Sequence, residues 1–232
     1  MNMNHIVAIF KKQLKDTLKN KTVLIQFVMF PVLTLIMNYA IQIEGMPENF
    51  FVNMFAAMYI GMAPLTSMAA VIAEEKEKNT LRVLMLSNVK PYEYLLGIGS
   101  YIWLACMLGA AVICAAGGYT QKAGILFMGI MATGIFASIL AGAAIGTWSR
   151  TQMMATSITV PVMIVLSFLP MLSWFNTTIA RIGKFVYSEQ ISRMLSQVNH
   201  LQLEAGNVCI IAGNMLIAAV LFIVAYKKCG LA

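Results

Sequence analysis

The charged residues of this chain are separated by six long runs in which no Asp, Glu, Lys or Arg occurs. Each run has 22 to 30 residues, and the flanking pairs are Lys21 and Glu44, Glu48 and Glu74, Glu93 and Lys122, Lys122 and Arg150, Arg150 and Arg181, and Glu204 and Lys227. A helix needs about 20 residues to cross the hydrocarbon core of a bilayer. The spacing therefore predicts six transmembrane helices, over residues 22–43, 49–73, 98–117, 123–147, 153–172 and 206–226.

The composition is that of a membrane protein with several spans. Hydrophobic residues make up 60% of the 232 positions and charged residues 11%, whereas soluble domains are about 45–50% apolar and about 25% charged. We therefore expect an all-α fold in which residues 1–232 form a single transmembrane domain. The net charge of +7 does not indicate nucleic-acid binding, because the basic residues lie beside the apolar runs, where they set topology.

The Lys and Arg residues are divided unequally between the two sides of the membrane. Twelve of the sixteen fall on the side of both termini, namely Lys11, Lys12, Lys15, Lys19, Lys21, Lys76, Lys78, Arg82, Lys90, Arg150, Lys227 and Lys228. The other side holds Lys122, Arg181, Lys184 and Arg193. Cytoplasmic loops carry the excess of Lys and Arg. We therefore expect a multi-pass protein of the bacterial cell membrane, with both termini and residues 74–97 in the cytoplasm.

Two segments outside the runs also have helical periodicity. In residues 1–21, apolar side chains recur at helical spacing between lysines, namely Ile6, Ile9, Phe10, Leu14 and Leu18. This pattern predicts an amphipathic interfacial helix; a basic flank that only fixes topology is the alternative. Residues 173–204 keep a looser period, which predicts short amphipathic helices on the extracellular surface. These helices either cover a pathway through the membrane or only anchor the chain.

The run at 123–147 contains small residues at a spacing of four, namely Gly134, Ser138, Gly142 and Gly146. A ladder of this kind lets two helix backbones approach closely. We expect it to pack within the bundle; a groove for dimerisation is the alternative.

Residues 74–97 form a charged island between two apolar runs. Four of the nine acidic residues and four of the sixteen Lys and Arg lie in it. Leu81, Leu84 and Leu86 make it too apolar for a plain solvated loop. The segment therefore predicts a short helix along the membrane surface, with one face available to a partner.

The sequence lacks the residue sets of intramembrane chemistry. No predicted span contains Asp, Glu, Lys, Arg or His, whereas proton- or ion-coupled pumps use ionisable groups inside the membrane. There is no phosphate-binding loop, no His-Glu-x-x-His and no Ser/His pair in the spans, and the four cysteines show no Cys-x-x-Cys spacing. We expect no enzyme activity and no cofactor or metal in this chain. Either its driving force comes from another protein, for which the island is the expected contact, or the chain is a passive channel or scaffold.

The island also resembles a known family. Its residues read Glu75-Lys76-Glu77-x-x-Thr80-Leu81-x-x-Leu84-x-x-Ser87-x-Val89-x-x-x-Glu93-x-Leu95-x-Gly97. They are similar to the segment that follows the second span in permeases of the ABC-2 type, the membrane subunits of ATP-binding cassette exporters. The chain departs from that pattern at four positions, with Asn79 for the usual glycine, Arg82 for an acid, Asn88 for proline and Ile98 for lysine.

The resemblance implies a function and partners. In that family the segment forms a coupling helix that docks on the ATPase, and Gly97 would begin the third span. The residues that would couple to the ATPase are Glu75, Glu77, Thr80, Leu81, Leu84 and Leu86. The family further implies a dimer of permeases, homo- or heteromeric, over two ATPase subunits, which bind ATP and Mg.

The substrate pathway is expected between the second and fifth spans of two protomers. Phe55, Tyr59, Met62 and Thr66 fall on one helical face of the second span, although ordinary helix packing explains such a face as well. The residues predicted to line the pathway are Asn53, Phe55, Tyr59, Met62, Thr66, Ser157 and Phe168. A cavity without charges and rich in Met and Phe suits an amphiphilic cargo, such as a hydrophobic peptide, an antibiotic or bacteriocin, or a lipid.

A membrane immunity or scaffold protein is the rival interpretation. Such a protein binds a toxin or peptide without transporting it, and it needs residues 173–204 rather than residues 74–97.

Overall fold

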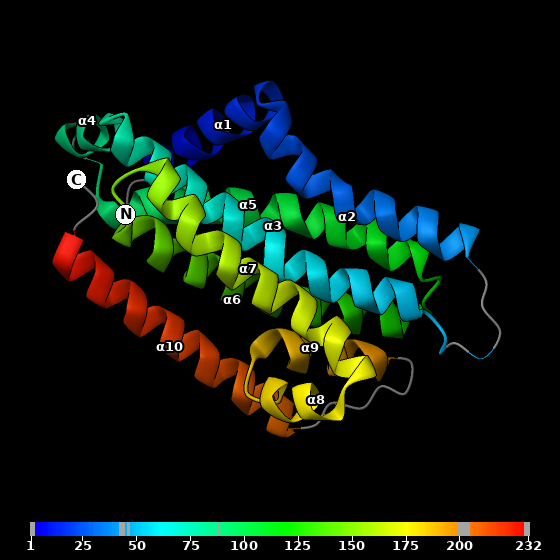
Figure 1. The fold of residues 1–232 in the computed structure, drawn as a ribbon. Helices are drawn as coiled ribbons and strands as arrows, with labels where there is room; N and C mark the ends of the chain where they lie inside the picture. The colour runs from blue at the N-terminus through cyan, green and yellow to red at the C-terminus, as the bar shows by residue number, and fades with distance from the viewer. Residues whose placement is uncertain (1–2, 42–44, 46, 88, 199–204, 230–232) are drawn as a thin grey trace.

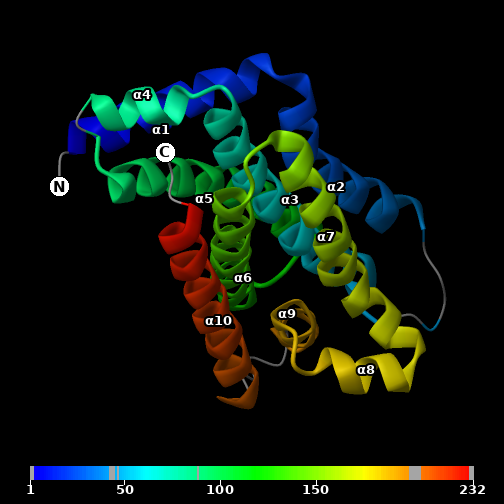
Figure 2. The same ribbon diagram turned by 60° about the vertical axis from the view of Figure 1, so that its left-hand side comes forward.

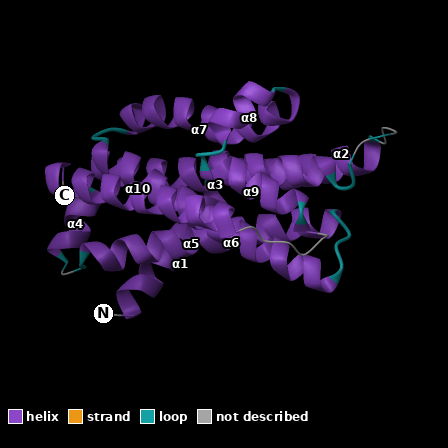
Figure 3. Ribbon diagram, turned by 90° about the horizontal axis from the view of Figure 1, so that it is seen from below, coloured by secondary structure: helices purple, strands orange, loops and turns teal. Residues whose placement is uncertain are grey.

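The computed structural model describes residues 3–41, 45, 47–87, 89–198 and 205–229. The regular secondary structure in these residues is helical: α1 (Met3–Lys19), α2 (Lys21–Ala40), α3 (Phe50–Glu77), α4 (Thr80–Leu86), α5 (Pro91–Ala116), α6 (Gln121–Trp148), α7 (Gln152–Phe175), α8 (Thr177–Gly183), α9 (Tyr187–Ser196) and α10 (Ala205–Cys229). The predicted all-α fold is confirmed (Figure 1). Short loops join the helices (Figure 3). Asn88 and residues 42–43 and 199–204 of the predicted segments lie outside the described residues.

Among the residues that the structure describes, five helices are long and apolar enough to cross a membrane, namely α3, α5, α6, α7 and α10. A sixth candidate is the pair formed by α1 and residues 24–40 of α2, which are bent by 69° relative to each other. The structure is that of a polytopic membrane protein with five to six candidate spans. α1, α4, the start of α5 and the end of α10 lie at one end of the bundle, and α8 and α9 lie at the other (Figure 2).

Helix α3 is the centre of the bundle, and small residues let its neighbours approach it. A Cβ atom built on Gly142 of α6 would lie 2.5 Å from the carbonyl oxygen of Leu65 in α3. The hydroxyl of Ser138 donates to the carbonyl of Ile60 at 2.7 Å. The ladder of small residues on α6 therefore packs against α3 inside the protomer, as expected. Residues without bulky side chains let the two helix backbones come into close contact.

Residues 74–97 divide between three helices. α3 continues four residues beyond the predicted span, to Glu77, and α5 begins at Pro91, seven residues before the predicted start at 98. Only α4 and its two short connections separate them. Pro91 starts α5 in the first helical turn, where its missing N–H has no helical partner to lose.

Helix α9 differs from its neighbour α8 in burial. α8 is exposed except at Gly183 and two half-buried residues, whereas eight of the ten residues of α9 are buried. The Tyr187 hydroxyl lies 2.7 Å from that of Ser138 on α6. α9 therefore inserts among α3, α6, α7 and α10 instead of resting on the surface (Figure 2). It also brings two charged residues, Glu189 and Arg193, into the bundle as an ion pair with a distance of 2.9 Å.

Candidate coupling site at the junction of α3 and α4

A single left-handed residue turns the chain between α3 and α4. Asn79 has φ 55° and ψ 12°. Asparagine is one of the few residues other than glycine that adopt this conformation readily. The replacement of the usual glycine of the family pattern by Asn79 is therefore compatible with this turn. Beside it, the Thr80 hydroxyl donates to the carbonyl of Glu75 at 3.1 Å, and Glu74 raises the pKa of Lys78 through an exposed ion pair.

Helix α4 has one buried face and one exposed face. Leu81 is fully buried, and Leu84 is half-buried against the hydrophobic core. Arg82 is exposed, as are Val83 at 61% and Leu86 at 81%. Two exposed apolar side chains beside a cation, at a polar end of the molecule, are typical of a surface that another protein covers.

The end of α3 is tied to α1 by a buried carboxylate. Glu75 is 8% exposed, and its Oε1 accepts from the ammonium group of Lys12 at 2.5 Å. A buried carboxylate is stable only when it is paired, so this contact fixes α1 against the end of α3. The exposed fraction of the Lys12 side chain is 42%, so water screens its side of the pair.

The start of α5 is tied to α1 in a similar way. His5 Nδ1 lies 2.9 Å from Oε2 of Glu93, whose side chain is 3% exposed. Between these two contacts, Gly97 lets α1 approach α5, because a Cβ atom there would lie 2.8 Å from Cγ2 of Ile9. α1 thus packs along α5 and is bonded to the end of α3 through Lys12, so that it acts as a strap between the two helices.

The last turn of α3 is also bonded to the connection between α6 and α7. Lys76 Nζ donates to the carbonyl of Thr147 at 2.7 Å, in the last turn of α6. The backbone N–H of Gln152 donates to Oε2 of Glu77 at 2.7 Å, at the start of α7. A cation at a helix C-terminus and an anion at a helix N-terminus are the favourable placements. Movement of this turn would therefore act on α6 and α7 directly.

The six residues predicted to couple to an ATPase fall into two groups. Four of them bond or pack within the protomer, namely Glu75, Glu77, Thr80 and Leu81. Leu86 is 81% exposed and its apolar side chain has no group that could form a hydrogen bond to fix it in the protomer, and Leu84 is half-buried between the two groups. Sequence reasoning missed the partners of the buried group, because Lys12 and Gln152 are far away in the chain. It also missed Val83 and Arg82 as members of the exposed face.

The residues predicted to line a pathway are divided as well. Asn53, Phe55 and Tyr59 are buried in the protomer. Asn53 accepts a hydrogen bond of 2.8 Å from the hydroxyl of Tyr119, in the connection between α5 and α6, and Tyr59 packs on the ring of Phe30. In this structure these three side chains contribute to helix packing within the protomer, which is the alternative to a role in lining the pathway.

The other four pathway residues are at least partly accessible. Met62 and Thr66 are half-buried on α3, and Ser157 and Phe168 are exposed on α7. Gln26 of α2, which sequence reasoning missed, accepts from the Thr66 hydroxyl at 3.3 Å. None of these four side chains carries a charge. Within the described residues, no group of three or more His, Cys, Asp or Glu side chains could hold a metal ion.

Comparison with known proteins adds a relationship over almost the whole length. The family model described as "ABC-2 family transporter protein" matches residues 2–227. No curated protein matches the chain in sequence. The match includes α1, the island and all the candidate spans, so it does not rest on the 74–97 segment alone.

Proposed function

The chain belongs to the ABC-2 transporter family, whose members are membrane subunits that work with an ATP-binding subunit, and from this premise we propose that it exports an amphiphilic substrate with α4 as its coupling helix. Two copies of the ATPase would bind ATP and Mg and close on each other. Their motion would reach this chain, paired with a second permease, through the exposed face of α4. The end of the bundle that carries α4 would face the cytoplasm, because the excess of Lys and Arg lies there.

The observation that carries this proposal is the way α4 is connected. The exposed face of α4 presents Val83, Leu86 and Arg82 to a partner, and the buried Leu81 anchors the helix in the hydrophobic core. The turn before it is bonded to α1, α6 and α7. Because packed protein interiors transmit displacement with little compression, a push on α4 would move several helices together.

The cargo proposal rests on the accessible residues that were predicted to line the pathway. Met62 and Thr66 are half-buried on α3, Ser157 and Phe168 are exposed on α7, and none of the four carries a charge. Apolar and weakly polar side chains bind a molecule that has both kinds of surface, and they attract an ionic solute poorly. A hydrophobic peptide, an antibiotic or bacteriocin, or a lipid therefore fits better than a sugar or an ion.

The test compares two equally exposed apolar residues at opposite ends of the bundle. Leu86→Asp should reduce the amount of ATP-binding subunit that co-purifies with the chain about tenfold, since one desolvated contact residue contributes about 1–2 kcal/mol. Phe185→Asp, at a residue that is 76% exposed beside α8, should leave co-purification unchanged. Leu86→Met is the conservative control and should keep the ATPase. Leu81→Asp is unsuitable, because Leu81 is fully buried and its loss would unfold α4.

The opposite result has a clear meaning. If Leu86→Asp keeps the ATPase and substrate efflux, α4 is not the coupling helix. If the chain protects cells from a toxin with no ATPase bound and Phe185→Asp abolishes that protection, the immunity or scaffold function is correct instead.

A further inference from the structure

A basic cavity lies where α3, α4, the connection between α6 and α7, and the end of α10 meet. It has a volume of about 510 Å³. Its lining residues are Lys76, Asn79, Leu81, Arg82, Arg150, Lys228 and Cys229. Four of these seven residues are cations, they come from four different parts of the chain, and none of the seven is acidic.

The positive charge of this cavity is poorly balanced by the protein. In the part of the chain that the structure describes, Arg82, Arg150 and Lys228 take part in none of the ion pairs. The ammonium group of Lys228 lies 5.6 Å from the centre of the Trp148 ring, and Lys76 donates to a backbone carbonyl. The contact of Lys228 with the ring does not neutralise its charge, so an anion in the cavity would gain the attraction of Arg82, Arg150 and Lys228.

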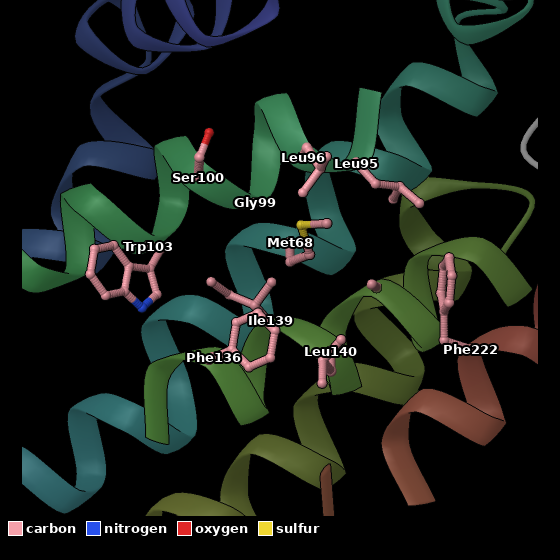
Figure 4. A pocket seen from close by; sticks show the side chains of 11 residues that line it. Met68, Leu95, Leu96, Gly99, Ser100, Trp103, Phe136, Ile139, Leu140 and Phe222 are labelled. Carbon is pink, nitrogen blue, oxygen red and sulfur yellow. The ribbon is translucent and has the colours of Figure 1, made fainter. Parts of the chain in front are cut away.

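A second, apolar cavity of about 420 Å³ lies between α3, α5, α6 and α10 (Figure 4). It has no charged lining residue. Leu96 and Trp103 of α5 and Phe136 of α6 border it, and Gly99 leaves space in its wall, because a Cβ atom there would meet only Cγ2 of Ile139, at 3.9 Å. Phe222 of α10 also lines it.

The two cavities follow one another along the same helices. On α10, Phe222 of the apolar cavity precedes Lys228 of the basic cavity by six residues, and on α3, Met68 precedes Lys76 by eight. At 1.5 Å per residue these intervals are about 9 and about 12 Å. Trp148, which is 41% exposed beside Lys228, is the kind of residue that marks the boundary between lipid chains and headgroups.

We propose that this pair of cavities binds one anionic phospholipid from the leaflet beside α4. The phosphate lies among Arg82, Arg150 and Lys228, and an acyl chain enters the cavity between α5 and α6. Guanidinium groups match the geometry of phosphate oxygens, and basic pockets between membrane helices suit acidic headgroups. The bound lipid would link α4 to the end of α10. The lining of this site includes none of the residues predicted to line the pathway, and the proposal does not depend on which cargo is exported.

The experiment measures lipid binding to the full chain, purified with its ATP-binding subunit, by native mass spectrometry. Phosphatidylglycerol should bind at least about tenfold more tightly than phosphatidylcholine. Arg150→Gln and Lys228→Gln should each weaken phosphatidylglycerol binding about five- to tenfold, the effect of one charge-assisted contact. Lys227→Gln removes the same charge one residue away, from a side chain that does not line the cavity, and should have no effect.

The acyl-chain half of the proposal has its own variants. Gly99→Leu fills the apolar cavity and should lower phosphatidylglycerol binding to the same extent. Gly129→Leu is the matched control, because no atom lies within 4 Å of a Cβ built there, and it should bind like the wild type. If Gly99→Leu does not fold, Gly99→Ala replaces it with a smaller effect in the same direction.

Four results would overturn the proposal. Equal losses in Lys227→Gln and Lys228→Gln would show a diffuse attraction to the membrane surface. Full displacement of the lipid by millimolar inorganic phosphate would show a site for free anions. Unchanged binding in Gly99→Leu would place the acyl chain elsewhere. Unchanged lipid binding in Arg82→Gln and Arg150→Gln, together with loss of the ATPase, would assign the basic cavity to that protein.

Discussion

Helices α3 and α10 differ in both hydropathy and burial, and the less hydrophobic of the two is the more buried. α3 has the lowest mean hydropathy of the five candidate spans, and 83% of its most apolar window is buried; α10 has the highest, and only 11% is buried. In a soluble protein the order would be reversed. In a bilayer the surrounding solvent is itself apolar, so close packing and hydrogen bonds hold helices together, and small or polar residues gather in the centre. The largest aliphatic side chains are left to face lipid.

The largest loss of stability is expected when the close packing around α3, at the centre of the bundle, is disrupted. Gly142→Leu should destabilise the protein by at least about 3 kcal/mol, because its first side-chain atom would lie 2.5 Å from a backbone oxygen that cannot move aside. Thermal unfolding in detergent, followed by size-exclusion chromatography, measures the loss. Gly129→Leu, on the same helix with open space around it, should unfold like the wild type. Equal stability of the two variants would refute the central position of α3.

A smaller effect is expected where charge, instead of shape, holds the end of α3. Lys12→Met leaves the buried Glu75 carboxylate without its cation and should cost about 1–3 kcal/mol. Lys11→Met is the matched control, since Lys11 is exposed and forms none of the ion pairs in the described residues. Adding Glu75→Gln to Lys12→Met should restore part of the lost stability. The idea of a strap fails if the double variant is less stable than either single one.

The smallest effect is expected on the outer face of α10. Leu216 is 68% exposed, so Leu216→Ala should change stability by less than about 0.5 kcal/mol. Met131→Ala, at a fully buried residue of α6, should cost about 2–5 kcal/mol in the same assay. A loss at Leu216 as large as that at Met131 would show that another chain, and not lipid, covers α10.

The number of spans could be predicted from sequence because uncharged runs of this length have few alternatives. Which side of each span faces the protein core and which faces the lipid could not be predicted. Tyr59 and Phe168 both look like members of an apolar face, yet Tyr59 is fully buried and Phe168 is 42% exposed. Helical periodicity separates apolar from polar surroundings, and within a membrane both the core and the lipid are apolar. In a membrane span, helical periodicity therefore does not distinguish a buried face from a face that contacts lipid.

The short helix within residues 74–97 was predictable for a different reason. Its charges and leucines stand in a polar setting, where amphipathic patterns keep their meaning, and the turn at Asn79 depends on local backbone preferences. The partners of Glu75 and Glu77 needed the fold, because Lys12 and Gln152 come next to α3 only when the bundle forms. A short helix was expected where α9 lies, but its burial was missed, because its polar residues look like a solvated face in the sequence and the contact of Tyr187 with Ser138 depends on the fold.

The small residues of α6 have a consequence for any pairing of two copies. Since Gly142 and Gly146 already lie against the backbone of α3, no second subunit can use them. Two copies that associate would have to use other surfaces, and exposed apolar side chains such as Ile36 of α2 and Val165 of α7 are available for this. Contacts of this kind are individually weak and easily rearranged, which is the property that two halves need if they are to separate and rejoin in every cycle.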